Sequence, residues 1–414
     1  MLDIKRMREN PGEYKLALQK RSVDTSVIDT ILDLDQQRRD LLQEVESLQH
    51  EKNIQSAEIG KLAKQGVDIS PLREKMNLLS QRITEGSEKV KGVQELLVQE
   101  MSVLPNIPHE SVPLGESADD NVIVKTWGEP RDFDFDPLSH VELGEKNGWI
   151  DFDKGVKLAG NKFTLLMGTG ATLSRKLQSL MLESAIARGY MEILPPYMAR
   201  REILFGSGQL PKFEEDLYKI EKEESFLIST GEIPLVNMMA NEIIEGTALP
   251  LKVTAATSCF RREAGAAGKE TRGLIRVHQF DKVELVQITK PEYSWDALEQ
   301  IVADAEAVLQ WLTLPYRIVT LCTGDLTTFT SAKTYDIEVW FPSMHKYVEI
   351  SSVSNCLDFQ ARRANIRYRD ENRNVQFVHT LNGSGLAIGR CMAALLENRQ
   401  QKDGSVLIND VLDL

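Results

Sequence analysis

One segment of this 414-residue chain carries an unbroken heptad repeat. From residue 72 to residue 97, apolar residues and one glycine recur at alternating spacings of four and three: Leu72, Met76, Leu79, Ile83, Gly86, Val90, Val93 and Leu97. On a helix these spacings align the side chains in one stripe, which a second helix must cover to keep it from water. The sequence therefore predicts a long helix that forms half of a coiled coil.

A second, weaker repeat precedes this segment and supplies the other half. It places six apolar residues on two neighbouring lines, Leu34, Leu41, Leu48 and Leu62 on one and Val45 and Ile59 on the other. In the short stretch between the repeats, Gly66 suits a helix C-terminus, and Ser70 before Pro71 suits an N-cap and a first helical position. We therefore expect two helices of about 31 residues in an antiparallel hairpin about 46 Å long.

The bend of this hairpin is mildly basic although the chain is acidic. The chain has 49 Lys and Arg against 62 Asp and Glu, a net charge of −13, which argues against a uniformly basic nucleic-acid-binding surface. Between residues 52 and 82, however, three acids accompany six basic residues: Lys52, Lys61, Lys64, Arg73, Lys75 and Arg82. This local excess suits contact with a nucleic-acid backbone, and an ordinary hairpin in a helical bundle is the alternative.

The composition changes after the hairpin. Pro105, Pro108 and Pro113 predict a linker at 105–119, between an N-terminal domain at 1–104 and a larger domain at 120–414. The larger domain mixes helical segments with strand-like runs such as LKVTAATSCF, KVELVQI and YDIEVWF. Because strands and helices do not alternate regularly, we expect an α+β fold with a largely antiparallel sheet.

Several familiar sites are missing from the sequence. Its four cysteines form no C-x-x-C pair and its six histidines show no metal-ligand spacing, so we expect no zinc. There is no P-loop for ATP, and NGSGLAIGR at 382–390 has the wrong glycine spacing for a dinucleotide site. The charged N-terminus and the lack of a long apolar run predict a cytoplasmic protein without a secretory signal or membrane span.

Arginines and glutamates on strand-like segments are the remaining candidates for chemistry. Phe280 and Ser352 lie near them in the sequence. In chain order, the full set of candidates is Arg261, Glu263, Arg276, Phe280, Glu284, Glu349, Ser352 and Arg390. Arginine among apolar residues needs an anionic partner, because an unpaired buried charge is costly. That partner is either a neighbouring glutamate or a phosphate-bearing ligand with Mg²⁺ on the carboxylates, and the residues alone leave both open.

Longer stretches carry a family resemblance. GYMEILPPYM, with Pro196, follows an amphipathic helix. It resembles motif 1 of the class II aminoacyl-tRNA synthetases, which implies a homodimer. FRREAG and RGLIRVHQFDKVE resemble motif 2, and LNGSGLAIGR resembles motif 3. With FGSGQLPKF, STGEIPL, KTYDIEVW and EISSVSNCLDFQARR, they make nearly the whole chain similar to the seryl-tRNA synthetases. The resemblance implies a class II catalytic domain on a mostly antiparallel sheet, and a coiled-coil arm that grips the long variable arm of serine tRNA.

The resemblance also implies an activity and residue roles. The activity is ATP-dependent conversion of L-serine to seryl-adenylate and transfer of serine to the 3′ end of serine tRNA, with selenocysteine tRNA left open. The implied catalytic residues are Arg261, Glu349 and Arg390, and the implied Mg²⁺ ligands are Glu349 and Ser352. The implied serine pocket is Thr230, Gly231, Glu232, Arg261, Glu284, Asn382 and Ser384. The implied ATP site is Arg261, Arg262, Glu263, Phe280, Glu349, Ile350, Ser351, Ser352 and Arg390.

Four features depart from the family pattern. Gly231 stands where alanine is usual, Arg262 where a small residue is usual, and Val353 where cysteine is common, and the loop at 326–331 is one residue longer. None removes an expected ligand, so we expect an active enzyme. The alternatives are a catalytically silent paralogue that binds tRNA or a partner, a paralogue resistant to a serine-adenylate mimic, and a ligase that charges a carrier protein.

Overall fold

The computed structural model describes residues 1–65, 68–264, 273–326 and 329–413. These residues form two compact units, Leu2–Leu104 on its own, and Pro105–Leu414 together with Met1. The stretch 105–119 belongs to the larger unit, where the Asn106 N–H donates to the Phe329 carbonyl at 2.9 Å. Within the described ranges, no helix is both long enough and apolar enough to cross a membrane.

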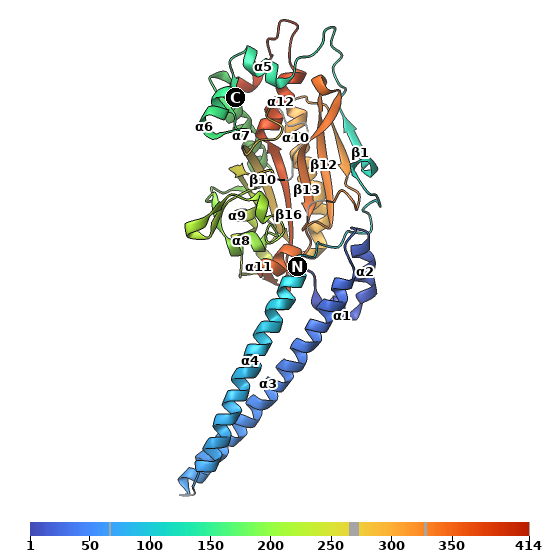
Figure 1. The fold of residues 1–414 in the computed structure, drawn as a ribbon. Coiled ribbons are helices and arrows are strands. Elements are labelled where there is room, and N and C mark those ends of the chain that lie inside the picture. Colours follow the sequence, from blue (N-terminus) through green and yellow to red (C-terminus); the bar gives the residue numbers. More distant parts are fainter. Residues whose placement is uncertain (66–67, 265–272, 327–328, 414) are drawn as a thin grey trace. The chain divides into compact units, whose positions relative to one another are not determined.

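The smaller unit is helical and contains the predicted hairpin. Its helices are α1 (Ile4–Glu9), α2 (Pro11–Gln19), α3 (Ser26–Lys64) and α4 (Ser70–Ser102). Figure 1 shows α3 and α4 side by side and antiparallel, which confirms the hairpin. The length of α4, 33 residues, is close to the expected length of about 31, whereas α3 has 39 residues because it starts well before the repeat, where Ile28 and Ile31 are fully buried. Ser70 is the first residue of α4 rather than its N-cap, which is Ile69, and Gly66 lies outside the described residues.

The heptad repeat forms the contact between these two helices. All eight residues of its stripe are buried or half-buried. Gly86 is in the stripe because α3 comes very close there, and a Cβ at this position would lie 2.7 Å from Val45 Cγ2. On α3, the heptad position between Leu48 and Leu62 is held by Gln55, which is 8% exposed and donates to Glu51 at 2.8 Å. A polar residue at this position explains why the repeat of α3 is the weaker one.

The larger unit is built on an eight-stranded sheet, as far as the described residues show. Its strands, in spatial order, are β1 (Val122–Trp127), β11 (Tyr316–Thr320), β12 (Lys333–Phe341), β13 (Lys346–Asn355), β16 (His379–Ala387), β10 (Gln279–Thr289), β9 (Leu251–Phe260) and β4 (Met191–Glu192). Neighbouring strands pair antiparallel except β4 and β9, which are parallel. The expected α+β fold with a largely antiparallel sheet is therefore confirmed, and the three quoted strand-like runs fall on β9, β10 and β12.

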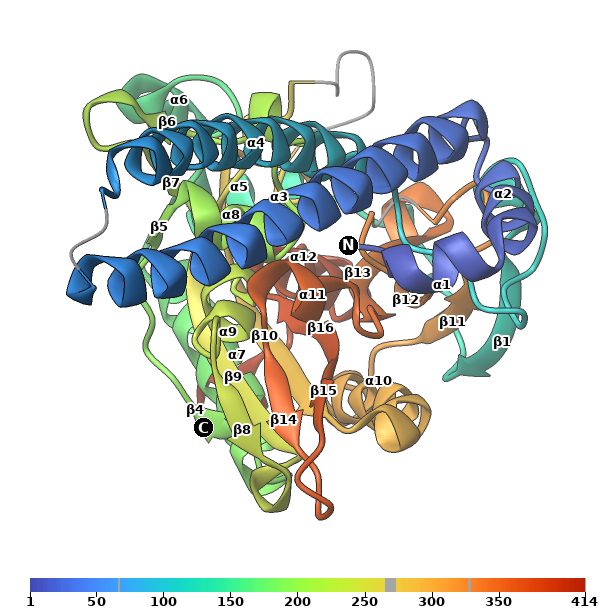
Figure 2. The ribbon, with the colours of Figure 1, turned by 90° about the horizontal axis from the view of Figure 1, so that it is seen from below.

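Both faces of the sheet are covered, and alternation along β10 shows how. Val283 and Leu285 face a core formed with α7 (Thr169–Ala187), α10 (Ser294–Trp311) and α12 (Ile388–Asn398), which Figure 1 shows packed beside the strands. Val286 and Ile288 face a second core with α9 (Glu232–Asn237) and α11 (Phe359–Ala364), seen from below in Figure 2. Side chains alternate along a strand, so the residues that precede Val286 on this face of β10 also point to the second face. They are not part of the second core, and their side chains are therefore available to a functional site.

Shorter elements complete the larger unit. The other helices are α5 (His140–Lys146), α6 (Phe152–Ala159), α8 (Arg201–Gly206) and α13 (Asn409–Leu412). The small sheets are β2 (Ile150–Asp151) with β3 (Leu165–Leu166), β5 (Met198–Arg200) and β6 (Lys219–Ile220) on either side of β7 (Ser225–Leu227), and β8 (Ile243–Glu245) and β15 (Val375–Phe377) on either side of β14 (Arg367–Arg369).

Candidate active site

A cavity of about 500 Å³ opens on the second face of the sheet and gathers most of the predicted residues. The predicted residues that line it are Thr230, Glu232, Arg261, Glu263, Arg276, Glu284, Glu349, Ser352, Asn382, Ser384 and Arg390. A smaller cavity of about 60 Å³ shares Arg261 and Arg390 with it and is lined by Phe280. Residues separated by up to 160 positions in the sequence therefore meet around one space.

Four residues predicted for the serine and ATP sites line neither cavity. Gly231 is buried beside the larger cavity, and Arg262 is exposed on the chain that follows β9. The Ile350 side chain is 1% exposed in the core with α7, α10 and α12. Ser351 is buried and donates from Oγ to the Ser384 carbonyl at 2.6 Å. The two serines thus join neighbouring strands rather than forming a cavity wall together.

A buried charge network forms one end of the larger cavity. Lys282 Nζ lies 2.5 Å from Glu284 Oε2 and 2.8 Å from Thr230 Oγ1, and the Thr230 hydroxyl donates to the same glutamate oxygen at 2.7 Å. The side chains of Lys282 and Glu284 are 9% and 2% exposed. Lys282 was not predicted, although it lies two residues after Phe280 and two before Glu284, on the same face of β10. That alternation was the signal available in the sequence.

Glu232 adds a second buried carboxylate to this end. It is the first residue of α9, and its Oε1 accepts from Asn382 Nδ2 at 2.9 Å and from Gln360 Nε2. Burial and then the negative charge of Glu284 raise the pKa of Glu232 to about 7. The cavity end therefore holds one ammonium, one carboxylate paired with it, and a second carboxylate that titrates near neutral pH.

Arginines line the other end. The Arg261 Nε donates to the Ser229 carbonyl at 3.2 Å, and its guanidinium carbon lies 5.1 Å from the centre of the Phe280 ring. Arg276 pairs with Glu263 at 2.5 Å. Arg390 donates from Nη1 to the Glu349 carbonyl at 2.7 Å and lies 3.3 Å from Oε1 of that side chain. These cations and an aromatic face suit a nucleotide with its phosphates.

A β-bulge places the two candidate Mg²⁺ ligands together. In a regular strand, Glu349 and Ser352 would point to opposite faces, because they are three residues apart. Glu338 pairs with Glu349 and Ile337 with Ser351, so Ile350 is an extra residue that turns both side chains toward the larger cavity. The same bulge sends Ile350 into the helical core.

The surroundings of this pair suit a cation. Asp336 lies opposite Ser352 on β12, and among the described residues nothing bonds to its buried Oδ1 atom. Burial and then the charge of Glu349 raise the pKa of Asp336 well above its ordinary value. Carboxylate and hydroxyl oxygens are donors that Mg²⁺ accepts, so the residues fit the metal that the resemblance implies.

Two of the departures from the family pattern border the cavity. A Cβ on Gly231 would lie 3.0 Å from Glu284 Cβ and 3.2 Å from Thr257 Oγ1, so glycine lets α9 approach β10 more closely than alanine would. From the longer loop, Phe329 and Thr330 line the cavity, while residues 327 and 328 lie outside the described part. Phe329 and Thr330 were not among the residues predicted for the site.

The predicted tRNA-contacting residues are in the smaller unit and are mostly exposed. Lys61, Lys64 and Arg73 are exposed near the bend, and Lys52 is half-buried. Lys75 and Arg82 pair across the hairpin with Glu51 at 3.2 Å and Glu44 at 3.5 Å, and all four side chains are at least 44% exposed. Because exposed ion pairs are weak, the Lys75 and Arg82 side chains can bind another anion in place of the glutamate.

Family models of known proteins match parts of both units. A family model described as the seryl-tRNA synthetase N-terminal domain matches residues 1–108, and one described as the tRNA synthetase class II core domain (G, H, P, S and T) matches residues 213–399. The serine–tRNA ligase of Thermoanaerobacter pseudethanolicus is 51% identical over 414 residues, with 100% of this chain and 97% of the relative covered. That of Desulfitobacterium hafniense is 50% identical over 413 residues, with 98% of the relative covered.

Solved structures agree as well. The seryl-tRNA synthetase from Pyrococcus horikoshii, complexed with ATP, is 41% identical with a TM-score of 0.92, and the match covers 100% of this chain and 97% of that one. The cytoplasmic serine–tRNA ligase from Naegleria fowleri, in complex with AMP, is 28% identical with a TM-score of 0.87, over 100% of this chain and 98% of that one. The chain therefore belongs to the seryl-tRNA synthetase family.

Proposed function

We propose that this chain activates L-serine with ATP to form seryl-adenylate and then transfers serine to the 3′ end of serine tRNA. The observation that carries the proposal is the gathering of Arg261, Arg390 and two buried carboxylates around one cavity, in a chain that matches serine–tRNA ligases over its full length. The alternative of a silent paralogue receives no support from these relatives.

The first step is an in-line displacement at phosphorus. The serine carboxylate attacks the α-phosphorus of ATP, a phosphoanhydride bond breaks, and pyrophosphate leaves. Arg261 holds the serine carboxylate beside the α-phosphate and neutralises their charges, while Arg390 lies on the nucleotide side, where Glu263 and Phe280 receive the adenosine. Because the carboxylate is already ionised, positioning and charge neutralisation suffice and no general base is needed.

The buried end of the cavity supplies specificity for serine. Thr230, Glu232, Glu284, Asn382 and Ser384 offer hydrogen-bonding groups for an ammonium and a hydroxyl, and Lys282 fixes the Glu284 carboxylate. When alanine binds, a polar group of the pocket loses its partner, and that loss disfavours alanine strongly. Threonine is excluded by the size of its extra methyl group.

Glu349 and Ser352 are the proposed Mg²⁺ ligands, with Asp336 behind them. The metal, when bound, neutralises the phosphate charge that develops as pyrophosphate leaves. Arg390 Nη1 lies 3.3 Å from Glu349 Oε1, and this contact keeps the Glu349 side chain turned toward the cavity.

The proposal assigns the tRNA to the smaller unit, which we take as the N-terminal domain at 1–104. Its exposed basic residues near the bend suit the phosphates of the long variable arm of serine tRNA. The segment 105–119 joins it to the catalytic domain at 120–414. Because charged tRNA feeds translation, we place the enzyme in the cytoplasm.

We further propose a homodimer formed around the motif 1 segment. Three large apolar side chains are exposed just after α7, namely Met191 at 54%, Leu194 at 87% and Met198 at 42%. Several exposed large apolar side chains within one short segment of the chain suit a contact surface. A second copy of the chain, with the same residues, would cover them.

Serine-dependent exchange of pyrophosphate into ATP tests the activation step. The full chain should catalyse exchange with serine, and with alanine or threonine only at a small fraction of that rate. Arg261→Gln should abolish exchange while leaving the fold intact, since the residue lines the cavity and is only half-buried. Absence of exchange by the folded parent protein, with tRNA supplied, would overturn the proposal.

A further inference from the structure

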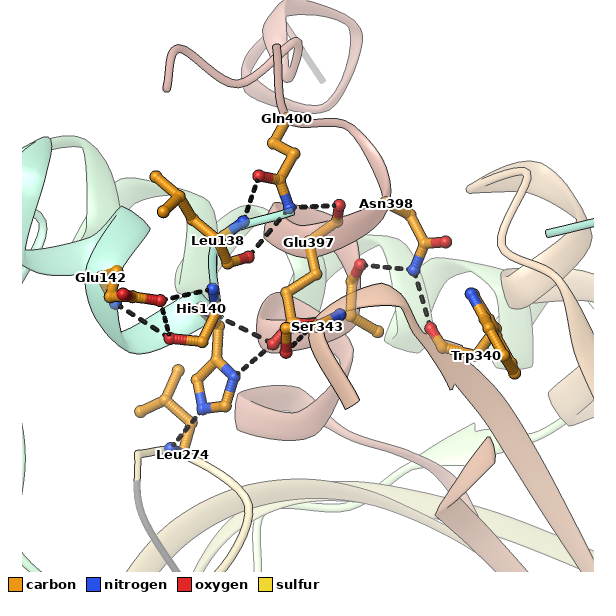
Figure 3. A network of polar contacts seen from close by, with 11 residues as sticks. Leu138, His140, Glu142, Leu274, Trp340, Ser343, Glu397, Asn398 and Gln400 are labelled. Carbon is orange, nitrogen blue, oxygen red and sulfur yellow. Dashed lines mark hydrogen bonds and ion pairs between the residues drawn. The ribbon is translucent and has the colours of Figure 1, made fainter. Parts of the chain in front are cut away.

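A buried histidine outside both cavities connects two elements of the nucleotide end. His140 is the first residue of α5 and is 3% exposed. Its Nδ1 lies 2.8 Å from Glu397 Oε1 on α12, and the backbone N–H of Leu274 donates to its Nε2 at 3.2 Å (Figure 3). Because a backbone N–H only donates, Nε2 must accept, and the ring proton is on Nδ1, from which it is donated to Glu397.

The histidine is held firmly on the α12 side. Glu397 Oε1 also accepts from the His140 N–H at 2.9 Å, while Oε2 accepts from the N–H and hydroxyl of Ser343 at 3.1 and 2.7 Å. Gln400 bonds both to the N–H and to the carbonyl of Leu138, just before α5 (Figure 3). Both oxygens of Glu397 therefore accept hydrogen bonds, two of them from His140, and this fixes the direction in which Nε2 of His140 points.

The segment that returns to β10 is built to reach this nitrogen. Gly273 has φ +81°, and a Cβ there would lie 2.1 Å from His140 Nε2. A side chain at 273 would therefore be strained by its backbone conformation and would also collide with the imidazole. Glycine at this position allows the next residue, Leu274, to donate its N–H to the ring.

The residues after Leu274 lead directly to the nucleotide end. The carbonyl of Ile275 accepts from Arg390 Nε at 3.0 Å, and Arg276 pairs with Glu263 at 2.5 Å. Arg390 is also seven residues before Glu397 on α12, which places both side chains on one side of that helix. The histidine thus joins the segment that holds the Arg390 guanidinium to the helix that carries it.

We propose that His140 is a positioning residue for ATP. By accepting a hydrogen bond from the Leu274 N–H, it fixes the position of segment 273–277 relative to α12. That position determines where the Ile275 carbonyl lies, and with it the Arg390 guanidinium, which donates to this carbonyl. The inference rests on the proposed function and adds to it a residue that touches neither substrate. We expect its effect at the nucleotide end, because segment 273–277 contacts Arg390 and Glu263 there, whereas the serine end lies further along β10 and on β16 and α9.

Two replacements of His140 separate its two hydrogen bonds. His140→Asn keeps a donor near the position of Nδ1, for Glu397, but has no acceptor for Leu274. His140→Gln keeps an acceptor near the position of Nε2, for Leu274, but has no donor for Glu397. Ser343→Ala is the matched control, because it removes a hydrogen bond from the same network without touching the 273–277 segment. Exchange kinetics give the KM for ATP and for serine, and thermal unfolding reports stability.

We expect His140→Asn to raise the KM for ATP about fivefold, which is the effect of one lost hydrogen bond, while the KM for serine changes less than twofold. His140→Gln should stay within twofold of the parent in both constants, and Ser343→Ala should lower only the unfolding temperature. Equal KM values for ATP in His140→Asn and in the parent would overturn the inference. So would equal rises in the two histidine variants, or a serine KM that rises as much as the ATP KM.

Two further outcomes are distinguishable. If His140→Asn fails to fold, Gly273→Ala tests the same contact from the other side, and an unchanged KM for ATP in that variant would overturn the inference. If the parent protein itself gives no serine-dependent exchange, the proposed function fails, whatever the variants do.

Discussion

Replacing Lys282 by methionine should destabilise the larger unit strongly, although no substrate is present. Its ammonium lies 2.5 Å from Glu284 Oε2, with the two side chains 9% and 2% exposed. The variant leaves the Glu284 carboxylate buried, with the Thr230 hydroxyl as the remaining donor among the described residues. Removal of one partner of a buried ion pair costs about 3–5 kcal/mol, so we expect a loss of that size in the free energy of unfolding.

The chain offers a matched control and a convenient signal for this measurement. Lys402 lies 3.4 Å from Asp134 with side chains 71% and 80% exposed, so Lys402→Met should cost less than about 1 kcal/mol. All five tryptophans of the chain lie between residues 127 and 340. Urea unfolding followed by tryptophan fluorescence therefore reports on the larger unit and is blind to the helical arm.

A double variant separates stability from function. Lys282→Met with Glu284→Leu removes both charges, and most of the lost stability should return because an apolar pair replaces the buried ion pair. Serine-dependent exchange should be absent from the double variant, since the pocket then lacks the Glu284 carboxylate. If Lys282→Met costs no more than Lys402→Met, or if the double variant is no more stable than the single one, the described charge network is wrong.

Three other predictions concern the same cavity. Gly231→Ala puts a Cβ 3.0 Å from Glu284 Cβ, so the KM for serine in the exchange assay should rise about threefold or more while that for ATP is unchanged, and an unchanged serine KM would count against this packing. Because burial raises the pKa of Glu232 to about 7, its carboxylate is lost below that pH, and the KM for serine should rise as the pH falls from about 8 to about 6. A Glu232→Gln variant with the same pH profile as the parent would refute that assignment. Glu349→Gln should raise, by about tenfold, the Mg²⁺ concentration at which ATP protects the chain from heat unfolding, and equal Mg²⁺ dependence would show that this side chain is no ligand.

The sequence was sufficient for features that depend on regular spacing. The stripe from Leu72 to Leu97 predicted the hairpin because 3.5-residue periodicity has one structural interpretation. It could not predict that α3 begins at Ser26, because the first turns of that helix are stabilised by packing and not by the repeat.

The site was predicted less completely, for a physical reason that Ile350 illustrates. Simple alternation separates Glu349 from Ser352, and the extra residue between them is visible only in the pairing of β13 with β12. Alternation with Phe280 and Glu284 indicates the face of β10 on which Lys282 lies, but its place in the charge network also depends on Thr230, which is 52 residues away in the sequence. Bulges and long-range ion pairs are set by tertiary structure, which a local pattern does not encode.

Aminoacylation of serine tRNA with labelled serine tests the central claim most directly, because it requires the cavity and the arm together. The full chain with ATP and Mg²⁺ should attach serine to the 3′ end of intact serine tRNA, and at least about tenfold more slowly to the same tRNA without its variable arm. Failure to charge the intact tRNA would contradict the account of the enzyme. Equal charging of both tRNAs would contradict the role given to the coiled-coil arm.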